Sequence, residues 1–150
     1  MATVQVAGER TLVQRAALIF GWAFVGVGVL GFLVTGASMQ DDPLLAPRLL
    51  GLFPLNVMHN VVHLLLGVWG IASAGSFAAS KSYAVGAGTI YLLLAVLGVF
   101  SPSMFGMVPI GGNDIWLHVL FGLPLLAIGL MAKRPEVIVA DRGADRATMP

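Results

Sequence analysis

Three histidines and one aspartate are the residues whose types and spacing could do chemistry in this chain. His59 and His63 lie four residues apart, and so do Asp114 and His118. On a helix, residues four apart share one face, one turn above the other. Each pair could therefore chelate a metal ion, and the imidazoles could also bind and release protons near neutral pH.

Each of these pairs stands at the start of a strongly apolar segment. Of the 150 residues, 58% are apolar and 10% are charged, whereas a soluble domain carries about 25% charged residues. Each apolar segment is near the ~20 residues that a helix needs to cross the hydrocarbon, and none alternates with period two. The segments are 16–38, 55–76, 83–100 and 114–132.

This pattern predicts an all-α integral membrane four-helix bundle that contacts the lipid bilayer. It excludes an ordinary soluble enzyme, because so few charges could not cover the surface of a folded chain in water. A net charge of +1 leaves no basic surface for phosphate, so no nucleic-acid partner is expected.

The apolar segments divide the chain into an N-terminal segment 1–15, a membrane domain 16–132 and a tail 133–150. With four spans, both termini and the connection at 77–82 share one side of the membrane. That side holds seven Lys and Arg residues, and the other side holds only Arg48. Because Lys and Arg accumulate in cytoplasmic flanks, both termini are predicted to be cytoplasmic.

The second and fourth segments carry the same spaced pattern. His-x-x-x-His-x-x-x-Gly at 59–67 superposes on Asp-x-x-x-His-x-x-x-Gly at 114–122 with an offset of 55 residues. This repeat predicts two tandem helical hairpins of the same orientation. A turn is expected at 79–81, and Asn56 and Asn113 are expected to cap the second and fourth helices.

Both polar faces are expected to point into the bundle, in the outer half of the bilayer, because a polar side chain facing lipid is costly. Four interpretations of this cluster are open. The first is a structural hydrogen-bond network, as in an accessory or assembly subunit of a larger membrane complex or in a homo-oligomer. The second is a divalent metal site formed by His59, His63, Asp114 and His118.

The third interpretation is haem b, with His63 and His118 as axial ligands. Gly67 and Gly122, one turn deeper, would then leave room for the flat ring. The fourth is movement of a proton or solute, although the inner half of the spans holds no ionisable residue to continue a relay. Paired carboxylates and a glycine-rich phosphate loop are absent, so a non-enzymatic protein is expected.

The motifs also resemble those of a bacterial family of small four-span membrane proteins catalogued as a domain of unknown function. The family pattern is Asn-x-x-His-Asn-x-x-His in the second span, here at 56–63, and an Asn-x-x-x-x-His element in the fourth, here at 113–118. The resemblance covers about residues 12–132. It implies a bacterial plasma (inner) membrane protein with four helices, and it implies no activity.

Overall fold

The computed structural model describes residues 9–134, so most of the predicted segment 1–15 and tail 133–150 lies outside the described residues. The described chain is all-α, as predicted, apart from one small β-hairpin that was not predicted. Its helices are α1 (Leu12–Thr35), α2 (Val57–Ser73), α3 (Phe77–Phe100) and α4 (Asn113–Met131). The strands β1 (Arg48–Leu49) and β2 (Phe53–Pro54) pair antiparallel before α2, and a 3₁₀ turn, η1 (Met104–Gly106), precedes α4.

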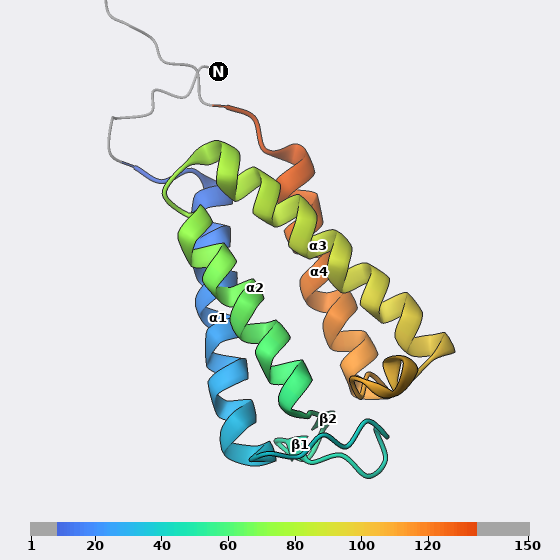
Figure 1. Cartoon of the computed structure of the whole chain (residues 1–150). Helices are drawn as coiled ribbons and strands as arrows, with labels where there is room; N and C mark the ends of the chain where they lie inside the picture. The colour runs from blue at the N-terminus through green and yellow to red at the C-terminus, as the bar shows by residue number, and fades with distance from the viewer. Residues whose placement is uncertain (1–8, 135–150) are drawn as a thin grey trace, which may run out of the picture.

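The four helices pack as two hairpins, which confirms that prediction. α1 lies along α2, and α3 lies along α4 (Figure 1). Glycines permit the close approach within each hairpin, since small residues let membrane helices pack backbone to backbone. A Cβ on Gly67 would lie 2.7 Å from the carbonyl oxygen of Gly21 in α1, and a Cβ on Gly122 would lie 2.9 Å from the Cβ of Tyr91 in α3.

An apolar core joins the two hairpins. Phe24 of α1 stacks on Tyr91 of α3, with ring centroids 4.8 Å apart and an interplanar angle of 17°. Leu66 and Leu125 belong to the same buried cluster. Stacked aromatic pairs contribute about 0.5–1.5 kcal/mol beyond the burial of their area. This core packs the two hairpins against each other.

The outer surface of the bundle is suited to lipid. α1, α3 and α4 are long and apolar enough to cross a membrane, and α2 is a shorter apolar helix of 17 residues. Large apolar side chains such as Leu33, Phe100 and Trp116 are exposed on these helices. Contiguous exposed apolar surface of this kind is typical of contact with lipid rather than with water. The fold therefore indicates a multi-pass membrane protein.

The helix bounds differ from the expected segments, most clearly at α3. This helix begins at Phe77, so the turn predicted at 79–81 is wrong. Ser76 caps it, with a hydroxyl that accepts a hydrogen bond from the backbone N–H of Ala79. The polar residues that suggested a turn are accommodated in the first helical turns, where Lys81 Nζ donates to a carbonyl at the end of α4 at 2.8 Å.

Candidate metal centre

Asn56 and Gly112 start the two helices that carry the site. Asn56 caps α2 as predicted: its Oδ1 accepts from the His59 N–H at 2.9 Å, and its Nδ2 donates to the carbonyl oxygen of Met107 at 2.8 Å. The cap predicted at Asn113 is wrong, because Gly112 occupies that position with φ 61° and Asn113 is already helical. Glycine tolerates this left-handed backbone, which a branched side chain would disfavour.

Both polar helix faces point into the bundle, which confirms that expectation. His59, His63, Asp114 and His118 are between 2% and 6% exposed. They lie at the end of the bundle that carries the β1–β2 hairpin and the connection between α3 and α4 (Figure 1). α2 and α4 thus bring together four residues that are up to 59 positions apart in the sequence.

Three of these residues approach one another closely enough to share an ion. The Nε2 of His59 lies 3.9 Å from Oδ2 of Asp114, and the Nδ1 of His118 lies 3.4 Å from the same oxygen. One ligand atom of each residue lies within 4.8 Å of those of the other two. Ligand atoms of tetrahedral zinc, each ~2.0–2.2 Å from the ion, lie about 3.4 Å apart. The distance between His59 Nε2 and Asp114 Oδ2 is within about half an ångström of this value.

His63 lies beside this group. Its ring stacks on that of His59, with centroids 4.7 Å apart and an angle of 18°. Its Nδ1 lies 3.1 Å from the carbonyl oxygen of His59, and the Nδ1 of His118 lies 2.8 Å from that of Asp114. A carbonyl only accepts, so each Nδ1 donates its proton and each Nε2 of the neutral ring keeps a lone pair. That is the tautomer that a metal-binding histidine needs.

Two buried polar atoms of the cluster lack a hydrogen-bond partner: His59 Nδ1 and Asp114 Oδ2. The backbone carbonyls of Pro54 and Pro109 lie near the His59 imidazole, but no hydrogen bond of ordinary geometry forms there. Buried polar atoms are paired in the great majority of cases, and an unpaired one costs about 1–3 kcal/mol. Asp114 Oδ2 is thus an acceptor that faces two imidazoles and has no donor.

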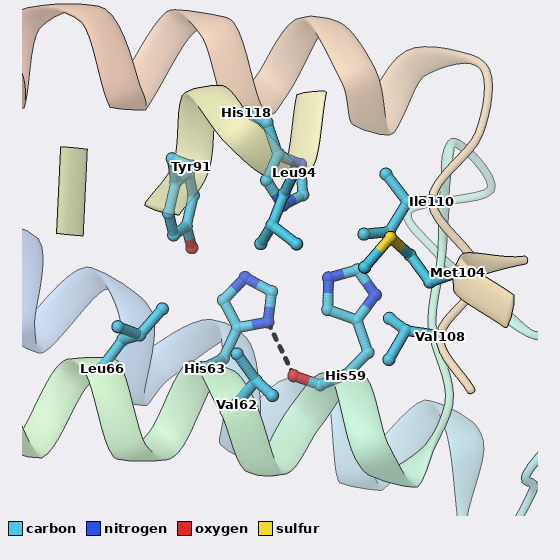
Figure 2. A pocket seen from close by; sticks show the side chains of 10 residues that line it. All are labelled: His59, Val62, His63, Leu66, Tyr91, Leu94, Met104, Val108, Ile110 and His118. Carbon is cyan, nitrogen blue, oxygen red and sulfur yellow. Dashed lines mark hydrogen bonds between the residues drawn. The ribbon is translucent and has the colours of Figure 1, made fainter. Parts of the chain in front are cut away.

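A cavity of about 50 Å³ opens against the cluster. Figure 2 shows side chains from α2, α3, α4 and the connection before α4 converging on it. The imidazoles and the Tyr91 ring provide its polar groups, and the rest of the wall is apolar. The lining residues are His59, Val62, His63, Leu66, Tyr91, Leu94, Met104, Val108, Ile110 and His118.

The cavity is small for an organic cofactor. Pockets for organic ligands usually hold about 300–1,000 Å³, far more than the roughly 50 Å³ present here. Gly67 and Gly122, which are the residues expected to leave room for a haem ring, each contact the other helix of their own hairpin. His63 and His118 both line the cavity.

Among the cavity residues that were not predicted from the sequence, Tyr91 and Met104 have side chains with a heteroatom. Tyr91 lies against His118, with ring centroids 4.7 Å apart. It is one of two tyrosines in the chain, and its place inside an apolar segment could have singled it out. Met104 also lines the cavity. It stands in a connection between helices, where no spacing rule relates it to the histidines.

Residues 14–131 match the family described as Domain of unknown function (DUF4383), and the chain belongs to that family. The match runs through all four helices and therefore includes the whole histidine and aspartate cluster. No curated protein and no solved structure matches the chain. The expected relationship to a family of unknown function is confirmed.

Proposed function

We propose that this chain is a small non-enzymatic membrane protein that binds a transition-metal ion through His59, Asp114 and His118. The observation that carries the proposal is the unpaired Oδ2 of Asp114, which is buried, lies 3.9 Å from Nε2 of His59 and belongs to a group in which one ligand atom each of His59, Asp114 and His118 lies within 4.8 Å of the others. Imidazole and carboxylate are both ligands of first-row transition-metal ions, and Zn²⁺ is a convenient probe of such a site because it has no redox chemistry. His63 is placed to complete or support this ligand set.

The alternative is a purely structural hydrogen-bond network in an accessory subunit. Such a network would pair its members, since a half-satisfied buried network is less stable than an apolar core. Here the carboxylate oxygen at the centre has no donor. Asp114 is also the only Asp, Glu, Lys or Arg side chain that is buried within residues 9–134. A bound cation would give the unpaired oxygen a partner and would balance the charge of the buried carboxylate.

The proposed location is the outer half of a bacterial plasma membrane, with both termini in the cytoplasm. Within the described part of the chain, five Lys and Arg residues lie near the end of the bundle opposite the site, and Arg48 lies near the site. Lys and Arg accumulate on the cytoplasmic side. Arg142 and Arg146, which contribute to the same predicted bias, lie outside the described residues.

Metal analysis of the purified protein tests the proposal. The chain is solubilised in detergent, incubated with Zn²⁺, freed of unbound ions and analysed by elemental mass spectrometry. The wild type should retain one ion per chain, and Asp114→Asn should retain less than about a tenth of that, a loss equivalent to at least ~1.4 kcal/mol of binding free energy. Asp41→Asn, in the connection before β1 and outside the cluster, is the matched control.

A circular-dichroism spectrum of each variant shows whether the helices are retained. A folded wild type that retains no ion from a panel of first-row metals would contradict the proposal. If that metal-free protein also co-purified stoichiometrically with other membrane subunits, the structural interpretation would be favoured.

A further inference from the structure

We infer that the ion held at this site is copper(I) and that the thioether sulfur of Met104 is one of its ligands. The inference rests on the metal site proposed above and names both its ion and a further ligand. Its premises are the position of Met104, the backbone that holds it there, and the charge of the cluster.

Met104 shares the cavity with all three histidines. Figure 2 shows its sulfur directed toward the cavity, on the side of His59 and Ile110. The side chain is half-buried, whereas the next residue, Phe105, is exposed. The turn therefore directs one apolar side chain outward and brings the thioether to the imidazoles.

The backbone at this turn has a conformation that few residues adopt. Met104 and Phe105 have φ values of 42° and 59°, in the left-handed region that L side chains other than Asn and Asp seldom occupy. Such residues persist only where their surroundings hold them, and they cluster at functional sites. Ser101 holds this turn: its carbonyl accepts from the Met104 N–H at 2.9 Å, and its hydroxyl from the Phe105 N–H at 3.1 Å.

A further hydrogen bond ties the end of the turn to α2. The Nδ2 of Asn56, the N-cap of that helix, donates to the carbonyl oxygen of Met107 at 2.8 Å. The same Asn56 side chain accepts from the backbone N–H of His59. One amide thus fixes the histidine-bearing helix and the methionine-bearing turn relative to each other. This is the kind of support that a pre-organised ligand set requires.

The ligand chemistry selects the ion. A thioether is a soft ligand that favours copper(I), and imidazole also binds copper well. The charge balance points the same way, because Asp114 is the one buried carboxylate among residues 9–134 and no buried Lys or Arg accompanies it there. A monovalent cation and this carboxylate together carry no net charge. A divalent ion would leave one uncompensated charge in an apolar, membrane-embedded cavity, which is costly.

Competition titrations in detergent test the inference. Copper(I) is supplied under anaerobic conditions with ascorbate, and its affinity is measured against a chromogenic copper(I) chelator, with Zn²⁺ affinity measured in parallel. Met104→Leu should weaken copper(I) binding at least ~10-fold and change Zn²⁺ binding by less than about 2-fold. Met107→Leu is the matched control: it lies in the same connection, is 52% exposed and does not line the cavity.

X-ray absorption at the copper edge gives a second readout. The wild type and Met107→Leu should show sulfur in the coordination shell, and Met104→Leu should show only nitrogen and oxygen. Unchanged copper(I) affinity in Met104→Leu, or no sulfur in the wild type, would overturn the inference while leaving a metal site intact. Equal loss of Zn²⁺ and copper(I) binding in Met104→Leu would also overturn it, because the residue would then act by holding the turn. A wild type that binds neither ion would refute the metal site itself.

Discussion

His63 and His118 make equivalent contacts in the two hairpins. The Nδ1 of each ring lies next to the carbonyl oxygen of the residue four positions earlier, at 3.1 Å for His63 and 2.8 Å for His118. Each ring therefore has the same tautomer, with a lone pair on Nε2. One turn further on, Gly67 and Gly122 each allow close contact with the other helix of their own hairpin. The 55-residue offset of the sequence pattern thus corresponds to equivalent local geometry.

The shared site predicts that His59 and His118 act as a unit in metal binding. His59→Ala and His118→Ala should each weaken Zn²⁺ binding at least ~10-fold, and the double variant should bind little more weakly than either single variant. The reason is that one ion needs both imidazoles, so removing the second ligand from an already broken site costs little. Measuring the Zn²⁺ dissociation constants of the wild type, the two single variants and the double variant completes a double-mutant cycle.

Ser80 provides the control for that cycle. It is buried at the opposite end of the bundle, where its hydroxyl donates to the carbonyl oxygen of Ser73 at 2.9 Å. Adding Ser80→Ala should change neither the Zn²⁺ affinity of the wild type nor the weakened affinity of the His59→Ala variant, because distant sites are energetically independent. Fully additive losses in the His59 and His118 pair would show that the two residues do not share an ion.

Much of this fold could be predicted from composition and spacing. The scarcity of charge indicated helices in lipid, and the repeated pattern at 59–67 and 114–122 indicated two hairpins. The start of α3 could not be predicted in this way, because Ser80 and Lys81 suggest a turn unless their buried partners are known. The sequence near residue 80 does not show that the Ser80 hydroxyl bonds back to the end of α2 or that Lys81 reaches the end of α4.

The candidate site was predictable only in part, and for a similar reason. Spacing of four residues brings the members of each pair to one helix face, and the cost of polar groups in lipid brings both faces inward. The residue spacing does not reveal that Met104 reaches the same cavity, because its position depends on a turn with positive φ. The spacing also does not reveal that a neighbouring helix fills the space beside Gly67 and the space beside Gly122.

Metal binding should stabilise the folded protein. An ion that binds the native state but not the unfolded one adds about 2.7 kcal/mol when its free concentration is 100 times its dissociation constant. Thermal unfolding in detergent should therefore shift upward when Zn²⁺ or copper(I) is added, and return to the metal-free value with a chelator. Asp114→Asn should show no shift under the same conditions. An equal shift in Asp114→Asn would mean that the ions bind elsewhere.

Gly31 should tolerate no side chain, because it packs against Asn60 of α2. A Cβ at Gly31 would overlap Oδ1 of Asn60, whose Nδ2 donates to the hydroxyl of Thr35 at 2.9 Å. Gly31→Ala should therefore destabilise the protein by about 1–3 kcal/mol, as overpacking usually does. Gly26 in the same helix has open space around it, and Gly26→Ala should be neutral or gain up to ~1 kcal/mol through helix propensity. Equal unfolding temperatures for the two variants would contradict this packing.

The absence of cysteine from the sequence permits a direct test of orientation. Leu44, in the connection before β1, is 81% exposed, and Lys133, just after α4, is exposed at the opposite end of the bundle. If both termini are cytoplasmic, a membrane-impermeant maleimide added to intact cells should label Leu44→Cys and not Lys133→Cys. Permeabilised cells should label both, which controls for reactivity. Labelling of Lys133→Cys alone in intact cells would reverse the orientation, and would place the metal site on the cytoplasmic side, where its ion would come from the cell rather than from outside.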